Sequence, residues 1–329
     1  SRAVLQLGNG GTSGAITGNI ADSGIFAIDR SDTYTFAGTI SGTGSFQQIG
    51  TGTTVLTAAN SYRGGTEISA GTLQVRNGSS IGTGAVTLDG GIFQAGATGL
   101  TVANPFVINT ANGTIDTQAF TLNLTGGISD GNGAGGLIKI GSGTLTLSGA
   151  SSYTGATAVN AGTLQAGAAD VFAPTSAFTI AGGTVLDLNN FDQTSGSLAG
   201  SGSVTLGSGT LITGVDNSST TYSGTIGGTG GLVKTGDGTL TLSGTSSYTG
   251  ATSIGGGTLQ AGAANALAAS SAFRVDSGTI LDLNNFNQTI GSLAGSGSVT
   301  LGSGTLTTGN DGSSTTYAGT IGGTGGLIK

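Results

Sequence analysis

The chain has 329 residues, of which 68 are glycine and 2 are proline, and it contains no cysteine, methionine, tryptophan or histidine. The net charge is −7 with only 8 basic residues, so the chain lacks the electrostatic attraction on which nucleic-acid binding depends, and we expect no nucleic-acid partner. Without cysteine and histidine a catalytic triad and a tetrahedral zinc site have no members, and we expect no metal and no cofactor.

The first residues, SRAVLQLGNG, carry neither an initiator methionine nor a basic region followed by an apolar one. We therefore expect the chain to be a piece of a longer protein from which any secretion signal is absent. Polar residues or glycine interrupt every apolar run before the ~20 residues that a membrane-spanning helix requires, so no such helix is expected.

One passage recurs along the chain at nearly constant intervals. The copies begin near Gly44, Gly135, Gly230 and Gly325. The intervals are therefore 91, 95 and 95 residues, and the segments 186–234 and 281–329 differ at only seven of 49 positions. A fixed period of this kind indicates stacked units in place of one closed core, so we expect residues 1–329 to form a single continuous array.

Within each copy, apolar residues alternate over four or five positions, as Leu240 and Leu242 do in GTLTL, and glycine, serine or asparagine bounds each run. This pattern predicts short strands separated by sharp turns. Leu145, Leu164 and Leu186 follow one another at 19 and 22 residues, which predicts coils of about twenty residues with three strands each. The sequence thus predicts an all-β fold, a parallel β-helix (β-solenoid) in the form of an elongated rod.

The period of 95 residues is expected to contain a whole number of coils, four or five, so that each copy returns to the same orientation. The interval of 91 residues would then differ by a shorter turn. Two alanine-rich segments, 166–178 and 261–273, break the strand pattern, and a short helical turn or a bulging loop is expected at each.

Asparagine pairs followed by phenylalanine recur where a turn must recur, and they predict an Asx turn or an amide ladder with the aromatic ring plugging the interior. Stacking of the exposed ring on a sugar is the lesser alternative. The residues are Asn189, Asn190, Phe191, Asn284, Asn285 and Phe286.

Five tyrosines fall at two repeated places, SYxG and TTYxG. They are Tyr62, Tyr153 and Tyr248 in the first and Tyr222 and Tyr317 in the second. We expect them to cover the flank of a coil with the hydroxyl in water, a binding stripe being the alternative. Lys139, Lys234 and Lys329 also share one position, where Lys234 precedes Asp237 by three residues, and we expect solvated surface there.

Carboxylate chemistry has one candidate pair, Asp187 and Asp192. The next copy has Asp282 and Asn287 at the same places, so it could not use two carboxylates to cleave a glycoside. We expect no enzyme. The stretches 129–136 and 308–314 are only loosely similar to calcium-binding loops, which gives little support to calcium.

The passage GGLVKTGDGTLTLSGTSSYTGATSIGGGTLQ resembles the passenger-associated transport repeat of bacterial autotransporters, and LDLNNFNQTIGSLAGSGSVTLGSGTL also resembles passenger sequence. The resemblance implies a type V secreted passenger of a Gram-negative bacterium, located outside the cell and folded as a right-handed parallel β-helix. It also implies export through a C-terminal outer-membrane β-barrel in the full-length chain, with repeats that support secretion and folding.

Three functional hypotheses follow. The first is a structural or adhesive stalk that attaches to a host surface, extracellular matrix or glycan, or to neighbouring cells in aggregates and biofilm. The second is a filament that self-associates through unpaired strand edges at its ends. The third is a carbohydrate-active β-helix enzyme, which would need clustered acids in one coil.

Overall fold

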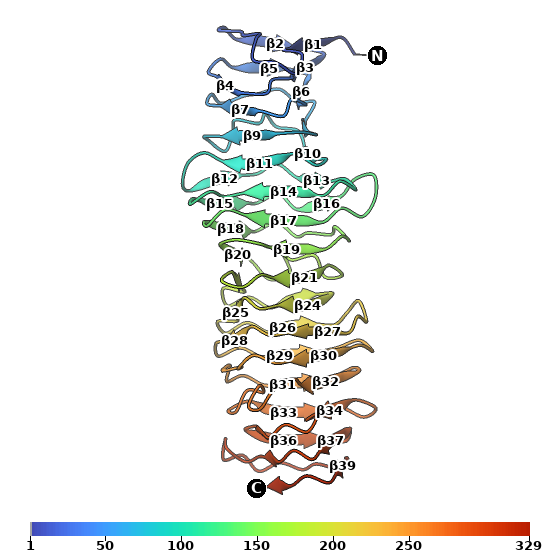
Figure 1. The fold of residues 1–329 in the computed structure, drawn as a ribbon. Helices are drawn as coiled ribbons and strands as arrows, with labels where there is room; N and C mark the ends of the chain where they lie inside the picture. Colours follow the sequence, from blue (N-terminus) through green and yellow to red (C-terminus); the bar gives the residue numbers. More distant parts are fainter. Residues whose placement is uncertain (1) are drawn as a thin grey trace. The chain divides into compact units, whose positions relative to one another are not determined.

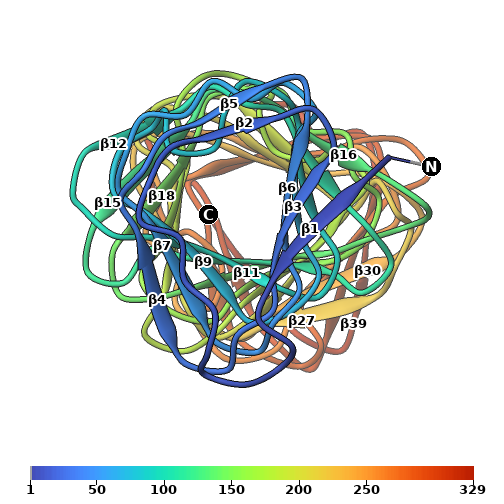
Figure 2. The same ribbon diagram turned by 90° about the horizontal axis from the view of Figure 1, so that it is seen from above.

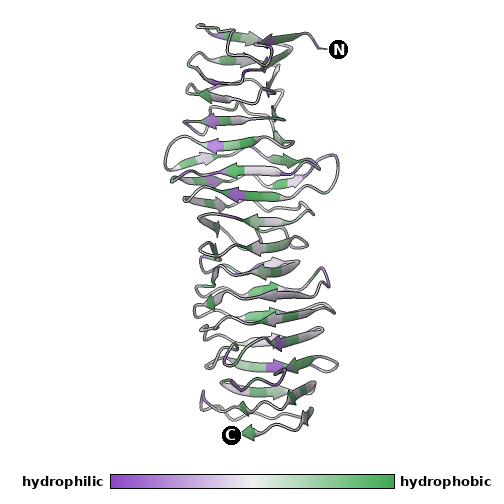
Figure 3. Ribbon diagram, in the orientation of Figure 1, coloured by the Kyte–Doolittle hydropathy of each residue, from purple (hydrophilic) through white to green (hydrophobic). Residues whose placement is uncertain are grey.

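Short alternating runs become strands because every second side chain can be buried on one side of the backbone. In β30 (Thr239–Leu242) the two leucines are buried and the threonines lie at the surface. The computed structural model describes residues 2–329, which contain strands and turns and no helix. Figure 3 shows hydrophobic and polar residues mixed along the same strands. No helix in this range is long and apolar enough to cross a membrane.

The chain divides into two compact units, residues 1–164 and 165–329. In each unit the strands of successive coils lie one above another and pair in parallel (Figure 1). Seen from above, the backbone runs around a centre (Figure 2). Buried apolar side chains form the core of the coils. The expected all-β class and the stacking of parallel coils into a β-solenoid are confirmed.

The first unit has strands on three sides of its coils. One side consists of β1 (Val4–Leu7), β3 (Ile25–Ile28), β6 (Ser45–Gln48), β8 (Thr66–Ile68), β10 (Val86–Leu88), β13 (Phe106–Ile108) and β16 (Ile128–Asp130). The second consists of β4 (Thr33–Phe36), β7 (Thr53–Leu56), β9 (Thr72–Val75), β11 (Ile92–Ala95), β14 (Gly113–Asp116), β17 (Leu137–Ile140) and β19 (Thr157–Val159). Shorter sheets hold β2 (Ile20–Asp22) with β5 (Ile40–Gly42), and β12 (Leu100–Val102) with β15 (Thr121–Leu124) and β18 (Thr144–Leu147). The strand β20 (Thr163–Ala166) spans the division.

The second unit repeats this arrangement. Its longest run consists of β21 (Ala177–Ile180), β24 (Ser197–Gly200), β27 (Thr220–Tyr222), β30, β32 (Thr258–Ala261), β34 (Ile280–Asp282), β37 (Ser298–Gly302) and β39 (Thr320–Gly323). A second sheet holds β23 (Gln193–Ser195), β26 (Leu211–Thr213), β29 (Leu232–Lys234), β31 (Thr252–Ile254), β33 (Ala272–Val275) and β36 (Ser292–Gly295). The remaining strands are β22 (Val185–Asp187), β25 (Ser203–Thr205) and β28 (Thr225–Gly227), and β35 (Gln288–Thr289), β38 (Leu306–Thr307) and β40 (Leu327–Ile328).

The core of the solenoid consists of files of inward side chains in register. In the second unit Leu240 pairs with Leu259, Leu259 with Leu281 and Leu281 with Val299, and all four are buried. Each such side chain contributes about 1.5–3 kcal/mol by leaving water. The register is specified because a shift of one residue would turn the whole file to the solvent side.

Copies of the same sequence lie on different sides of the coil. The prediction that each period contains a whole number of coils is therefore wrong. In the second unit β24 lies in the sheet of β21 and β27, whereas its copy 95 residues later, β36, pairs with β33 in another sheet. Between them the chain returns to the sheet of β24 at β27, β30, β32 and β34. In the first unit β6 and its copy β17, 91 residues later, also lie in different sheets.

The physical reason is that coil length varies while each side offers the same apolar interior. Partners on neighbouring coils are 18 residues apart at Asn190 and Ser208 and 22 apart at Ser203 and Thr225. Each copy is therefore turned about the coil axis relative to the one before it within a unit. Repeated surface residues do not form a straight stripe.

Between β20 and β21, and between β32 and β33, the two alanine-rich segments form loops with turns and no helix. The loop alternative is confirmed and the helical turn is wrong. Val171, Phe172 and Ala173 of the first loop are buried. The apolar residues of the loop thus point inward and fill the coil where no strand does.

Candidate functional site

Three repeated tyrosines are buried, which contradicts the expectation that their hydroxyls lie in water. In each copy the hydroxyl meets that of the threonine four residues later. The pairs are Tyr62 with Thr66 at 2.6 Å, Tyr153 with Thr157 at 2.5 Å and Tyr248 with Thr252 at 2.6 Å. The spacing places the ring inside the coil and the threonine at the start of the next strand, so each buried polar group has a partner.

The other tyrosine position is also turned inward. The Tyr222 hydroxyl donates to the carbonyl of Gly202 at 2.7 Å, and that of Tyr317 donates to Gly297 at 2.9 Å. Burial raises the pKa of Tyr222 and of Tyr317 above the ordinary tyrosine value. These hydroxyls bridge neighbouring coils. Four of the five repeated tyrosines are buried and Tyr317 is half-buried, so together they form no exposed stripe.

Two of the repeated lysines are buried, so the expectation of solvated surface is wrong for them. The Lys139 ammonium donates to the carbonyl oxygens of Ile140, Gly141 and Ala161 at 2.7–3.0 Å. Desolvation lowers the pKa of Lys139 to about 8, and the charge of Asp116 opposes that shift.

Lys234 repeats this arrangement on the carbonyls of Thr235, Gly236 and Gly256 at 2.7, 2.9 and 3.1 Å. Two of these carbonyls belong to the turn that follows the lysine and the third to the next coil. Each ammonium therefore ties one coil corner to the next, and neither is available as a surface charge.

The asparagine pairs occupy tight turns, as the local sequence predicts, but the Asx bond comes from the preceding aspartate. The Asn189 amide donates to the Asp187 carboxylate at 2.9 Å. Asn189 and Asn190 have φ of 49° and 71°, in the left-handed region that asparagine tolerates. Their side chains connect coils: Asn189 donates to the Ala166 carbonyl and Asn190 accepts from the Ser208 amide. Asn284 and Asn285 repeat this geometry.

Phe191 and Phe286 do not plug the interior, and this prediction is wrong. Phe191 is half-buried and Phe286 is 36% exposed. Two consecutive left-handed residues reverse the chain, so that Leu188 takes the inward position and the phenylalanine after the turn faces outward.

Sequence reasoning missed a pair of buried glutamines that hold the alanine-rich loops. The Gln193 side chain accepts from the amides of Val171 and Phe172 at 3.1 and 3.2 Å and donates to the Ala168 carbonyl at 2.6 Å. Gln288 does the same for the second loop through Leu267 and Ala263. Their recurrence at one place in both copies, directly after the asparagine and phenylalanine turn, was the available signal.

Both carboxylates of the candidate pair accept hydrogen bonds that stabilise the fold. Asp187 accepts from Gln165 at 2.9 Å as well as from Asn189, and Asp192 accepts from the Thr210 amide at 2.7 Å. Among residues 2–329 no three histidine, cysteine, aspartate or glutamate side chains gather in a group that could hold a metal ion.

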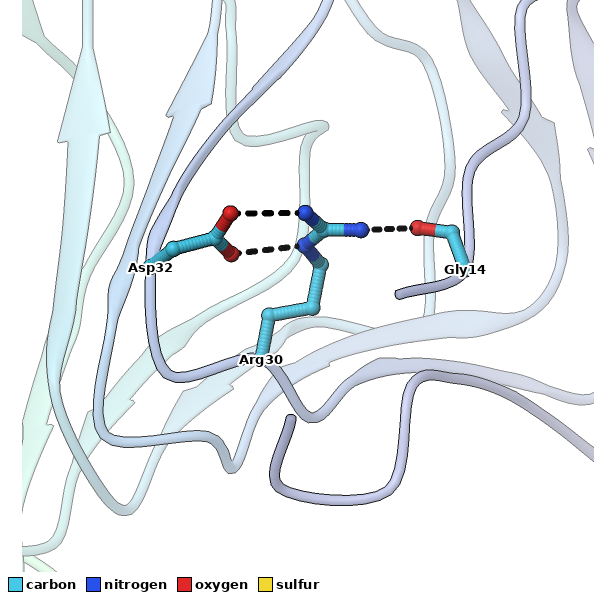
Figure 4. Close-up of polar contacts among 3 residues, drawn as sticks. All are labelled: Gly14, Arg30 and Asp32. Atoms are coloured by element: carbon cyan, nitrogen blue, oxygen red, sulfur yellow. Dashed lines mark hydrogen bonds and ion pairs between the residues drawn. The ribbon is translucent and has the colours of Figure 1, made fainter. Parts of the chain in front are cut away.

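Arg30 is a further buried cation, near the beginning of the chain. Its guanidinium binds both carboxylate oxygens of Asp32 at 2.8 and 2.9 Å and the carbonyl of Gly14 (Figure 4). The guanidinium also lies 4.9 Å from the centre of the Tyr34 ring. Hydrogen bonding to Asp32 raises the pKa of Arg30. The bond to the Gly14 carbonyl holds the 8–18 loop against the coil.

One open groove of about 240 Å³ is lined by charged side chains. It lies over β6, β8 and β10, beside the turn that carries Arg63. The Gln47 side chain donates to the Glu67 carboxylate at 2.6 Å on one wall. This groove is one of several surface hollows among residues 2–329, and another, of about 410 Å³, is lined by Tyr317, Leu327 and Lys329. Phe286 is among the exposed large apolar side chains.

Comparison with known proteins gives two findings. The family model of the passenger-associated-transport-repeat matches residues 46–75, 137–166 and 232–261. A protein named adhesin BmaC autotransporter, from Brucella suis biovar 1 (strain 1330), is 37% identical over 152 residues, which cover 43% of this chain and 4% of that relative. The aligned part is therefore a small fraction of the relative's length, and no solved structure matches the chain. The chain therefore contains three passenger-associated transport repeats on stacked parallel coils, and part of it is similar to part of an autotransporter adhesin.

Proposed function

We propose that the chain is a segment of a non-enzymatic, adhesive passenger stalk that attaches the cell to host surfaces, extracellular matrix or other cells. On this proposal the segment lies outside the cell, anchored at the outer membrane or released, and the matched repeats and the autotransporter relative support this location. The curated relative is named an adhesin, and this name motivates the adhesive part of the proposal.

The observation that carries the proposal is the use of the repeated side chains. The bond between Tyr248 and Thr252 closes a corner within one coil. Lys234 on its carbonyls and Gln288 on its loop hold one coil to the next. A repeat whose recurring polar groups are internal is suited to build length, since each added coil brings its own corner contacts. Adhesion then depends on exposed groups that vary between the copies.

A carbohydrate-active enzyme is not favoured. The two carboxylates that sequence reasoning put forward are committed to backbone amides and to Gln165. Neither lines a groove named above, and a glycosidase would need both carboxyl groups on one substrate.

We further propose that the repeats support folding outside the cell. Each corner contact lies within one coil or between neighbours, so ordered coils can template the next as the chain emerges. In the full-length protein this proposal includes a C-terminal outer-membrane β-barrel domain through which the passenger is exported.

The test displays the full-length protein on a non-adherent laboratory bacterium. Attachment to surfaces coated with extracellular matrix or glycans, and settling of cell suspensions, are compared with the same host lacking the protein. We expect attachment or aggregation to require the displayed protein and to fall when purified residues 1–329 are added as a competitor. Equal attachment with and without the protein would refute the adhesive function.

A further inference from the structure

Free positive charge is scarce on this chain, and its position is informative. Lys139 and Lys234 are buried on carbonyls, and Arg30 and Arg274 are paired with aspartates. Arg2 and Lys329 lie at the first and last described positions. Of the exposed basic side chains in residues 2–329, Arg63 and Arg76 lie away from the chain ends and form no salt bridge, and Arg63 lines the groove over β6, β8 and β10.

The wall of this groove is a row of outward side chains on three paired strands. Gln47 pairs with Glu67 and Glu67 with Thr87 in the strand register. The Gln47 amide donates to one Glu67 oxygen at 2.6 Å, which fixes the carboxylate beside the groove. The row presents one carboxylate, one amide and one hydroxyl within reach of the same bound molecule.

The floor of the groove is backbone. Gly64, Gly65 and Gly84 line it without side chains. A Cβ on Gly64 would meet the Gly44 carbonyl oxygen at 2.6 Å, and one on Gly84 would meet the Gly65 nitrogen at 2.5 Å. Glycine is therefore required here by close stacking of the coils, and the same requirement leaves the groove open.

The chemistry of the groove is peculiar to the first copy of the repeat. In the later copies, the position of Arg63 is occupied by Thr154 and Thr249. The position of Glu67 is occupied by Ala158 and Ser253. The buried tyrosine and threonine recur in all three copies. A residue needed for coil stacking would recur in the same way, so the charged pair is not explained by the architecture.

We propose that this groove binds one carboxylated sugar ring of an acidic glycan, an inference that rests on the adhesive function above. A guanidinium pairs with a carboxylate through two parallel hydrogen bonds, which Arg63 supplies. Glu67, Gln47 and Thr87 then accept from or donate to the sugar hydroxyls. Glu67 would repel a ligand that carries only carboxylates, and the lining has no aromatic or large aliphatic anchor for a peptide.

The test titrates the purified chain with a uronic-acid disaccharide, with its neutral counterpart in which each carboxylate is a hydroxymethyl group, and with a tetra-aspartate peptide. Binding is followed by NMR shift changes at low salt. We expect the uronic-acid disaccharide to shift the amides of residues 63–67 and 87 and to bind at least tenfold more tightly than the other two probes. Arg63→Gln should weaken its binding at least tenfold, while Arg76→Gln, a matched control on an exposed arginine outside the groove, should leave it unchanged.

Each other outcome overturns the inference. If the neutral disaccharide bound as tightly as the uronic-acid disaccharide, Arg63 would not recognise a carboxylate. If the peptide bound as tightly, the sugar hydroxyls would not contribute to recognition. No shift at residues 63–67 would place any binding elsewhere. The binding assay uses the purified chain, so its result does not depend on the attachment assay. A displayed protein that fails to promote attachment would refute the adhesive function. Absence of uronic-acid binding by the purified chain would refute only the present inference.

Discussion

The buried tyrosine and threonine of the third copy provide a quantitative test of how the coils are held. The Tyr248 hydroxyl meets Thr252 Oγ1 at 2.6 Å, and the same Oγ1 meets Ser271 Oγ at 2.8 Å. Ser271 Oγ in turn donates to the Gly250 carbonyl at 2.7 Å. The chain of hydroxyls therefore connects the turn before β31 to the coil that follows it.

The expected free energies follow from which groups lose their partners. Tyr248→Phe keeps the ring and leaves Thr252 bonded to Ser271, so it should cost about 1 kcal/mol, the net worth of one hydrogen bond. Thr252→Val leaves the buried Tyr248 hydroxyl without its partner, which should cost about 2 kcal/mol. The double variant removes both ends, and it should cost about 1 kcal/mol less than the sum of the single variants.

Native-state hydrogen exchange is the suitable assay because a solenoid can open coil by coil and a global unfolding curve would average over the coils. The opening free energy is measured for the amides of β31 and β33. Exchange in the first unit, where neither residue lies, is the internal control. Additive costs in the double variant, or no change at β31 in Thr252→Val, would contradict the proposed hydroxyl chain.

Three further outcomes are expected. Because the pKa of Lys139 is lowered to about 8, the unfolded state binds more protons than the folded state between about pH 8 and the ordinary lysine value of ~10.4, so the free energy of unfolding should rise with pH there. Urea titrations at pH 8 and 9.5 should show a smaller rise in the free energy of unfolding for Lys139→Gln than for the unchanged protein. The control Lys329→Gln should show the same rise as the unchanged protein. An equal rise in all three proteins would contradict the lowered pKa of Lys139. Arg30→Gln should speed hydrogen exchange in residues 8–18 and leave the second unit unchanged, and unaltered exchange would show that the guanidinium does not hold this loop. Phe286→Ala should lower the local free energy of opening, measured by hydrogen exchange, by less than about 1 kcal/mol. Phe273→Ala removes a buried ring and should lower it by about 3–5 kcal/mol. Similar losses in the two variants would refute the placement of the two rings.

The strands and their parallel stacking could be predicted because both depend on patterns a few residues long. Leu240 and Leu242 alternate with threonine and are followed by glycine-rich turns, which leaves few alternatives to short stacked strands. The burial of Tyr248 was also within reach, since a threonine follows the tyrosine at the fourth position in every copy.

The burial of Lys234 and the exposure of Phe286 could not be predicted from such short patterns. Lys234 is charged and would be placed at the surface by any burial rule, yet Gly256, 22 residues later, completes its set of carbonyls. Phe286 is apolar and would be placed inside, yet the two left-handed residues before it turn it outward. In both cases the backbone path of a corner decides the side chain's environment, and that path involves the neighbouring coil. The groove at Arg63 depends in the same way on side chains from three strands.

The turning of successive copies about the coil axis shows that the strands are interchangeable among the sides of the coil. β24 and β36 have the same sequence, SLAG, and pair in different sheets of the second unit. An inward file of leucine, valine and isoleucine accepts the same residues on every side, so the side that a segment occupies is set by the lengths of the preceding turns. Copies of one surface residue therefore point in different directions, which suits contact with several separate partners better than with one straight polymer.

This reasoning predicts that one whole period can be removed without loss of the fold. Deletion of residues 187–281 joins Leu186 to Asp282 and restores the local sequence LDLNNFNQT at the junction. We expect the shortened chain to keep its β-sheet circular dichroism and cooperative melting, with every later coil turned to a new side. Deletion of residues 187–271 joins Leu186 to Ala272, breaks the order of strand and turn, and should abolish protection from exchange around the junction. If the first deletion unfolded the chain as the second does, the phase of the coils would be fixed by contacts beyond the neighbouring coil, and local turn length would not determine it.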